Sequence, residues 1–214
     1  MRIIEPSWCF EEEINPKAIM EKIERAGRTC YKSEGRIGDG TAEKFIASII
    51  KRGHEAVLEH ASISVRIICD RGVSHEIVRH RLAAYCQEST RYCNYADGKF
   101  GRELTFIKPC YWDEGSEMYE VWSDTMQSVE QVYQFMVARK AKPEEARAVL
   151  PNSLKTELVM TMNIRSWRHF FKLRTSLAAH PQMREIAGMI LEGFRRELPV
   201  LFGDIGGNDG EKAN

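Results

Sequence analysis

The stretch RHRLAAYCQESTRY, residues 79–92, concentrates side chains that bind anions. These are three arginines, a histidine and a serine: Arg79, His80, Arg81, Ser89 and Arg91. A guanidinium group can hold a phosphate through two parallel hydrogen bonds, and a serine hydroxyl with neighbouring loop amides can complete the site. The nearest carboxylates in the sequence, Glu76 and Glu88, are too few to neutralise the arginines. The composition therefore predicts an external anionic ligand, with a solvated basic helix end as the alternative.

The helix expected over residues 166–177 carries a cation among apolar side chains. Its apolar stripe consists of Trp167, Phe170, Phe171 and Leu177. Arg174 lies on the same stripe, and an unpaired guanidinium in apolar surroundings is energetically costly. We therefore expect Arg174 to be buried and to face either a carboxylate or an anionic ligand. Further donors for a polar ligand, or else ordinary surface residues, are Asn163, Arg165 and His169.

The segment RGHEAVLEHAS, residues 52–62, gathers groups that bind metals in other proteins: His54, Glu55, Glu59 and His60. Their spacing is HExxxEH rather than the HExxH of zinc hydrolases, and the strand that follows leaves no helix to align the ligands. We therefore expect no metal, and histidines that hydrogen-bond a ligand or the backbone. A metal-dependent hydrolase using His54 and His60 remains an alternative.

Cys86 lies inside the basic stretch, where Arg81 and Arg91 would favour a nucleophilic thiolate. The alternative that we favour is a small packing residue. The sequence contains no GxGxxG motif and no phosphate-loop lysine motif, so a bound nucleotide would have to be held by arginines.

The overall charge limits the classes of function. The 214 residues contain 31 basic and 31 acidic side chains, which argues against a general nucleic-acid binder. A single-stranded nucleic-acid-binding module stays open as a second function, with Tyr85, Tyr92 and Tyr95 as stacking platforms. The six cysteines never form CxxC, and no apolar signal or membrane-spanning stretch occurs. We expect a cytoplasmic protein with reduced thiols and no membrane association.

Hydrophobic periodicity predicts an α+β fold in one domain, residues 1–202, with a central, mostly antiparallel sheet flanked by helices. The expected strands are Ala61 to Asp70, Leu104 to Lys108 and Leu158 to Met162. The expected helices run from the Asn15-Pro16 cap to Gly27, from Thr41 to Arg52, over residues 71–81, from Ser116 to about Lys140, from Pro143 to before Pro151, over residues 166–177 and onward from Pro181. The long amphipathic helix after Ser116 should use its apolar residues for the core, and residues 203–214 should form a disordered tail.

Four motifs together resemble the flavin-dependent thymidylate synthase family, over roughly residues 15–200. They are RHR followed seven residues later by STRY, GHEAVLEH at 53–60, ARAVLP at 146–151 and NIRSWRHFFKLR at 163–174. The resemblance implies reductive methylation of dUMP to dTMP. Methylenetetrahydrofolate would be the carbon donor, NADPH would be the hydride source through FAD, and no enzyme cysteine would attack the uracil. It also implies a homotetramer with active sites shared between subunits.

The resemblance also assigns site residues. Catalytic roles fall to Arg174, which would favour ionisation of the pyrimidine, and to Ser89. The implied dUMP contacts are Glu76, Arg79, Gln87, Glu88, Ser89, Thr90, Arg91, Arg147 and Arg174. The implied FAD contacts are His54, Ala56, Glu59, Arg79, His80, Arg81, Gln87, Asn163, Arg165 and His169. Three positions depart from the commonest family pattern: Ala56 stands where Ser or Thr is frequent, Gln87 where Glu is frequent and His169 where Asn is frequent.

Overall fold

The computed structural model describes residues 1–206, and its contacts divide the chain into two compact units. Unit 1 comprises Met1–Ser7, Ile67–Arg79 and Tyr85–Val159, and unit 2 comprises Trp8–Arg66, His80–Ala84 and the chain from Met160 onward. The long strands β3 (Ser62–Asp70) and β6 (Lys155–Asn163) contribute residues to both units. Among residues 1–206, no helix is long and apolar enough to cross a membrane.

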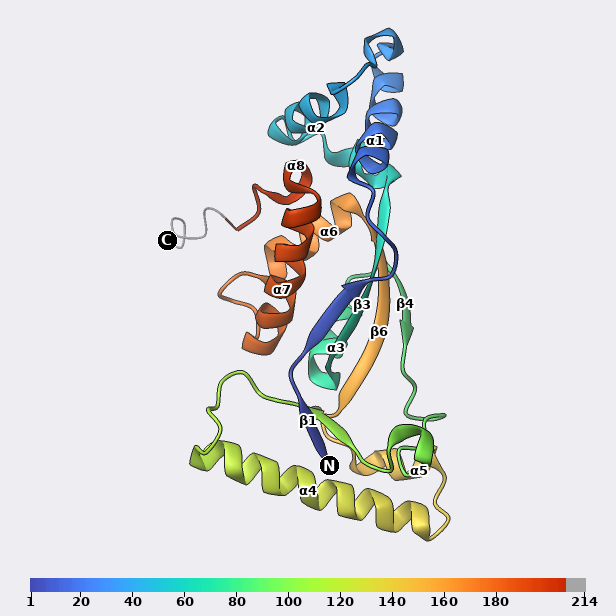
Figure 1. Cartoon of the computed structure of the whole chain (residues 1–214), viewed down its shortest axis with the longest axis vertical. Coiled ribbons are helices and arrows are strands. Elements are labelled where there is room, and N and C mark those ends of the chain that lie inside the picture. Colours follow the sequence, from blue (N-terminus) through green and yellow to red (C-terminus); the bar gives the residue numbers. More distant parts are fainter. Residues whose placement is uncertain (207–214) are drawn as a thin grey trace. The chain divides into compact units, whose positions relative to one another are not determined.

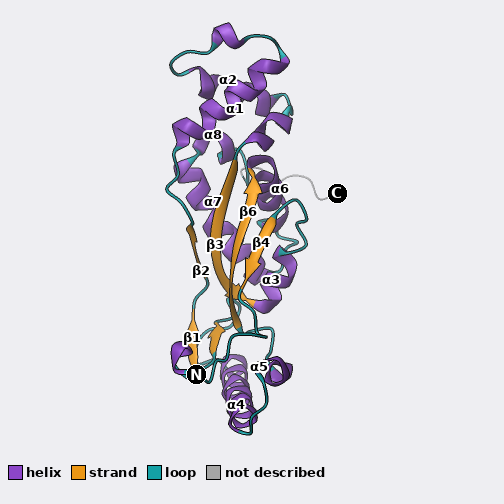
Figure 2. Cartoon of the chain, turned by 90° about the vertical axis from the view of Figure 1, so that its right-hand side faces the viewer, coloured by secondary structure: helices purple, strands orange, loops and turns teal. Residues whose placement is uncertain are grey.

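Four strands form the main sheet in the order β2-β3-β6-β4, where β2 is Ser7–Phe10 and β4 is Ala84–Gln87 (Figure 2). Strands β3 and β6 are antiparallel, because Ile164 donates its N–H to the Ala61 carbonyl at one end and Arg71 donates to the Leu154 carbonyl at the other. The predicted alternation of β3 is confirmed by its buried residues: Ile63, Val65, Ile67 and Cys69. A second, parallel pair joins β1 (Arg2–Ile4) to β5 (Thr105–Ile107).

The expected α+β class with a mostly antiparallel sheet is confirmed, but three strands were not foreseen. Strands β1, β2 and β4 have only three or four residues each, which is too short for a clear period of two. Strand β4 contains Tyr85, Cys86 and Gln87, for which no strand was predicted.

The helices of unit 1 are α3 (Arg71–Ile77), α4 (Glu117–Ala138) and α5 (Pro143–Ala146), with short 3-10 turns η3 (Gly98–Phe100) and η4 (Arg147–Val149). Unit 1 contains an apolar cluster to which helices α4 and α5 contribute Trp122, Met126, Tyr133 and Ala146. Ser116 caps α4, as predicted, by accepting the Tyr119 N–H at 3.3 Å. Helix α3 is shorter than the predicted 71–81, so the RHR triplet follows the helix rather than ending it.

The long helix α4 is confirmed, but the expectation that its apolar residues all serve the core is wrong (Figure 1). One face is buried through Trp122, Met126 and Tyr133. Four other apolar side chains remain exposed, with relative exposures of 47 to 60%: Met118, Val121, Val132 and Phe135. Apolar residues cover more than one face of this helix, and only one face can pack against the unit 1 cluster.

Unit 2 contains the remaining helices. They are α1 (Pro16–Cys30), α2 (Thr41–Lys51), α6 (Ile164–Arg174), α7 (Pro181–Glu197) and α8 (Pro199–Phe202), with the 3-10 turns η1 (Glu34–Arg36) and η2 (Glu55–His60). Its core is a cluster of mutually packed aromatic rings: Trp167, Phe170, Phe171, Phe194 and Phe202. Helix α7 buries an apolar stripe that includes Ile186, Ile190, Leu191 and Phe194.

Two predicted ends in unit 2 are corrected. Asn15 caps α1 as predicted, accepting the Ala18 N–H at 3.0 Å, but the helix continues past Gly27 to Cys30. Gly27 is required for packing instead, since a Cβ there would lie 2.5 Å from the Phe45 ring. The disordered tail was predicted to begin at residue 203, which is too early, because Ile205 is 1% exposed and Asp204 forms an ion pair. The rest of that tail, residues 207–214, lies outside the described residues.

Candidate functional site

The predicted site residues fall into two groups that follow the division of the chain. Most of the predicted dUMP residues belong to unit 1, and most of the predicted FAD residues belong to unit 2. The RHR triplet itself is divided, with Arg79 in unit 1 and His80 and Arg81 in unit 2. Each group is therefore described within its own unit.

In unit 1, Gln87 ends strand β4 and is held by two hydroxyl groups. Its Nε2 donates to Ser74 Oγ at 2.9 Å and to Thr156 Oγ1 at 3.2 Å, and both of these residues are fully buried. An amide nitrogen has two hydrogens, so both donors of Gln87 are used inside the protein. Only its side-chain carbonyl oxygen is left for a ligand, which makes direct binding of an anion by this side chain implausible.

Glu88 is fixed through both carboxylate oxygens. Oε1 accepts the Tyr95 hydroxyl at 2.8 Å, and Oε2 pairs with Lys155 Nζ at 2.8 Å. Burial, together with the Glu88 carboxylate, raises the pKa of Tyr95 well above its usual range, so the phenol stays protonated and keeps donating. The Glu88 N–H also donates to the Glu157 carbonyl on β6. Glu88 thereby anchors the start of the loop that carries Ser89 and Arg91.

The loop after Glu88 presents the cationic end of the motif. Ser89 Oγ accepts the Arg91 N–H at 3.3 Å, which leaves the hydroxyl hydrogen of Ser89 to donate elsewhere. The Arg91 side chain is 54% exposed, lies over the Tyr92 ring at 5.3 Å and approaches the exposed Glu144 carboxylate at only 3.9 Å. Thr90 is buried, Glu76 is half-buried, and the side chains of Arg79 and Arg147 are exposed.

In unit 2, His80 and Arg174 form a direct pair. Arg174 Nε donates to His80 Nε2 at 3.0 Å, which requires a neutral imidazole at this position. Burial, then the positive charges of Arg174 and His169, lower the pKa of His80 from 6.5 to about 4. The His80 ring also packs against Phe170, with 4.9 Å between ring centroids. His80 is therefore an uncharged acceptor at neutral pH and holds Arg174 by one of its donors.

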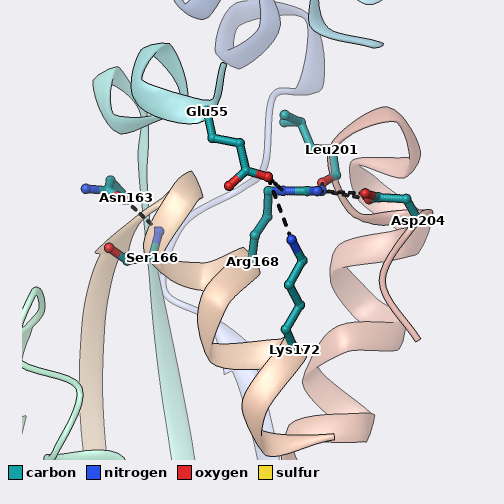
Figure 3. Close-up of polar contacts among 7 residues, drawn as sticks. All are labelled: Glu55, Asn163, Ser166, Arg168, Lys172, Leu201 and Asp204. Carbon is teal, nitrogen blue, oxygen red and sulfur yellow. Dashed lines mark hydrogen bonds and ion pairs between the residues drawn. The ribbon is translucent and has the colours of Figure 1, made fainter. Parts of the chain in front are cut away.

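The buried arginine of α6 is Arg168, not Arg174 as predicted. Arg168 is 1% exposed, whereas Arg174 is only half-buried in the last turn of the helix. Arg168 donates to Asp204 through NH1 and NH2 at 2.7 Å each, to Glu55 at 3.2 Å and to the Leu201 carbonyl (Figure 3). Its charge is thus compensated by carboxylates of the same chain, and Leu177, predicted on the buried stripe, is 81% exposed.

The sequence contains a signal for this buried position. Residues 164, 167, 168 and 171 follow the i, i+3, i+4, i+7 spacing of one helix face, which places Arg168 between buried neighbours. The helix ends at Arg174, so the stripe has no further turn to bury. Lys155 and Tyr31 were not predicted, because their partners are distant in the sequence, whereas Tyr95 was named only as a stacking platform and instead donates to Glu88.

Some of the predicted FAD residues around η2 and α6 already form hydrogen bonds or ion pairs within the protein. Asn163 Oδ1 caps α6 by accepting the Ser166 N–H at 2.8 Å, and Figure 3 shows its amide nitrogen directed away from that bond. Arg165 pairs with Glu59 at 2.5 Å, with both side chains about half exposed. His54 Nδ1 lies 3.2 Å from the Tyr31 hydroxyl. Ala56, His169 and Arg81 are exposed.

Two further features bear on the chemistry. Within residues 1–206, no group of three or more His, Cys, Asp or Glu side chains is arranged to hold a metal ion. All six cysteines are free, and Cys86 is exposed on strand β4.

Comparisons with known proteins agree on one family. The sequence profile of the family described as thymidylate synthase complementing protein matches residues 16–200. A flavin-dependent thymidylate synthase of Pyrococcus furiosus is 36% identical over 167 residues, covering 78% of this chain and 68% of that protein. A flavin-dependent thymidylate synthase of Corynebacterium aurimucosum is 35% identical over 195 residues, covering 86% of this chain and 78% of that protein.

Among solved structures, the fold resembles that of the UMP/dUMP methylase PolB from Streptomyces cacaoi bound with 5-Br dUMP. The TM-score is 0.77, and the match covers 95% of this chain and 96% of that chain. The sequence identity is 19%, so this likeness concerns the fold alone.

Proposed function

This chain belongs to the flavin-dependent thymidylate synthase family, and from that membership we propose the details of its reaction. The chain is accordingly a flavin-dependent methyltransferase of dTMP biosynthesis. In the proposed reaction dUMP is the acceptor, methylenetetrahydrofolate supplies the carbon, and NADPH supplies the reducing hydride. The single observation that carries this proposal is the family match over residues 16–200, which includes every predicted site residue.

We assign the phosphate of dUMP to the cations and the hydroxyl of unit 1. Ser89 keeps a hydroxyl hydrogen to donate, and Arg91, whose side chain is 54% exposed, lies 3.9 Å from the exposed Glu144 carboxylate, a long ion pair that neutralises it weakly. Gln87 and Glu88 are instead assigned to holding the loop, because their polar atoms are largely used by the protein. The other proposed dUMP residues keep the roles implied by the resemblance: Glu76, Arg79, Thr90 and Arg147.

The proposed role of Arg174 is to stabilise negative charge that develops on the pyrimidine. The neutral His80 ring accepts from its Nε and so fixes the plane of the guanidinium group without competing for its charge. A carboxylate in place of His80 would neutralise Arg174 before substrate binds. The pair therefore supports an arginine whose guanidinium group is oriented from its Nε side by an uncharged acceptor.

The residues of unit 2 fit the proposed binding of FAD. When bound, the flavin supplies the redox chemistry by taking up and passing on a hydride. The chain's own contribution is a set of donors for flavin oxygens and nitrogens, with Asn163 and Arg165 held in place by the α6 cap and by Glu59. Exposed Ala56 offers no hydroxyl, so the contact that Ser or Thr gives in relatives is replaced by backbone or lost. The remaining proposed FAD residues are His54, Arg79, Arg81 and His169.

A homotetramer with shared active sites is part of the proposal. Exposed apolar side chains on α4 support an interface, since Met118, Val121, Val132 and Phe135 present a contiguous helix side to solvent in the single chain. Leu82 and Tyr92, inside the predicted site motif, are also about 80% exposed. We also propose a cytoplasmic location, which the six free cysteines support.

The test is formation of dTMP by purified protein supplied with dUMP, methylenetetrahydrofolate, NADPH and FAD. We expect product only when all four are present, and a yellow protein whose flavin absorbance bleaches with NADPH. Folded protein that binds flavin but forms no dTMP under these conditions would refute the proposed substrates.

A further inference from the structure

Unit 2 contains a large cavity that none of the predicted dUMP or FAD residues lines. Its volume is about 690 Å³, within the usual range of small-molecule sites, and it is formed by the end of α1, the segment through η1, and α2. Figure 1 shows α1 and α2 packed side by side. Five of the eleven lining residues are cationic, and none is acidic: Arg28, Lys32, Arg36, Lys44 and Arg52.

Most of this positive charge is not neutralised by the protein. Arg28 is the exception, because its guanidinium donates to the buried Glu24 carboxylate at 2.7 Å and lies 4.7 Å from the Phe45 ring centroid. Lys32, Arg36, Lys44 and Arg52 have no carboxylate within ion-pair distance among residues 1–206. Since the whole chain has equal numbers of acidic and basic residues, this local excess is not a reflection of its composition.

The cavity also offers groups that suit a nucleoside. Tyr31 lines it with a ring that is 56% exposed, which is available for stacking against a base. Ser33 and Ser48 add hydroxyl groups. The Tyr31 hydroxyl lies 3.2 Å from His54 Nδ1, so the cavity adjoins a residue of the proposed flavin region within the same unit.

We propose that this cavity binds the adenosine 2′-phosphate end of NADPH. The inference rests on the proposed function, which requires a phosphorylated nicotinamide nucleotide as hydride source. A phosphate monoester carries nearly two negative charges at pH 7, whereas each phosphate of a diphosphate bridge carries one. The monoester therefore gains most from several unpaired cations. An adenine ring beside that phosphate matches the exposed Tyr31 ring, whereas the glutamate tail of a folate has no ring to place there.

The test uses adenosine 2′,5′-bisphosphate as a probe, titrated calorimetrically into the FAD-loaded protein. The pocket variant is R36Q/K44Q, and the matched control is R25Q/K51Q, which removes one arginine and one lysine from α1 and α2 outside the cavity. Lys44 and Arg36 are exposed, so both double variants are expected to fold. We expect the pocket variant to bind the probe at least about tenfold more weakly and the control to bind it like wild type. Binding of adenosine, which has no phosphate for these cations to hold, should be equal in all three proteins.

Steady-state kinetics separates the alternatives. The pocket variant should raise the KM for NADPH about tenfold while leaving kcat and the KM for NADH unchanged. Unchanged affinity for the probe, or a raised KM for polyglutamylated methylenetetrahydrofolate with an unchanged KM for NADPH, would overturn the assignment. Failure of the proposed function looks different: wild-type protein would bind the probe through these cations and yet form no dTMP.

Discussion

Replacing Arg168 with methionine should destabilise unit 2 strongly, because Asp204 and the Leu201 carbonyl lose this donor and Glu55 is left with Lys172 at 3.8 Å. Breaking a fully buried ion pair costs about 3–5 kcal/mol. Here the guanidinium is 1% exposed, but the side chains of Glu55 and Asp204 are 23% and 48% exposed, so water can partly rehydrate the two carboxylates. We therefore expect a loss of about 2–3 kcal/mol. For a chain of this size, that lowers the melting temperature by roughly 4–12 °C.

The measurement is thermal unfolding followed by circular dichroism at pH 7, with R196M as the control. Arg196 is 74% exposed and pairs only with its neighbour Glu197, so its loss should cost less than about 1 kcal/mol. Adding D204N to R168M should recover part of the lost stability, since the Asp204 carboxylate that has lost its hydrogen bonds from Arg168 is then replaced by an uncharged amide. Equal melting temperatures for R168M and wild type, or equal losses in R168M and R196M, would refute the reasoning.

The same network has a defined dependence on pH. The hydrogen bonds from Arg168 lower the pKa of Asp204, so its contribution to stability is complete above the ordinary range of an aspartate and is lost as the pH falls through the lowered pKa. The R168M variant should therefore lose less stability than wild type between pH 5 and pH 3. A variant that follows the wild-type acid profile would show that Asp204 is not held by Arg168.

Three further predictions concern the site. The pKa of His80 is lowered from 6.5 to about 4, so its NMR titration should be centred near pH 4, and a titration near 6.5 would contradict the Arg174 contact. The contribution of His80 to the free energy of unfolding should be complete above pH 6.5 and should fall as the pH drops from about 6.5 to about 4. R174A should abolish dTMP formation and return the His80 pKa toward 6.5, whereas R184A on α7, outside the proposed site, should retain activity. C86A should retain substantial dTMP formation, because Cys86 lies exposed on β4 and has no proposed covalent role; a folded, flavin-binding but inactive C86A protein would restore the nucleophile hypothesis.

The fold could be predicted where local patterns and burial agree. The alternation of β3 and the apolar stripe of α7 both correspond to buried residues, so the periodicity of each element shows which face is inside. Strand β4 could not be predicted, because its Tyr85, Cys86 and Gln87 depend on pairing with a strand some seventy residues away, not on their own period. Gly27 was predicted to end the first helix, but it lies inside α1, where the absence of a side chain allows close packing against Phe45.

The site residues stay a prediction, and the structure adds which of their polar groups the protein itself uses. Sequence patterns identify where arginines, hydroxyls and amides gather, yet they do not show which of these groups the protein itself uses. The same helix contains Arg168 and Arg174, and only the three-dimensional partners distinguish a structural arginine paired with Asp204 from one held by the neutral His80 ring.

That division has a consequence for the basic stretch around residues 79–92. Gln87 has given both amide hydrogens to Ser74 and Thr156, and Glu88 has both oxygens occupied by Tyr95 and Lys155. These two residues therefore set the position of the loop before any ligand arrives, which lowers the entropy cost of ordering it on binding. We propose that the ligand contacts then fall to side chains that keep their donors, Ser89 and Arg91 among them. On that proposal, the motif contains two interleaved sets of residues, one that shapes the loop and one that contacts the anion.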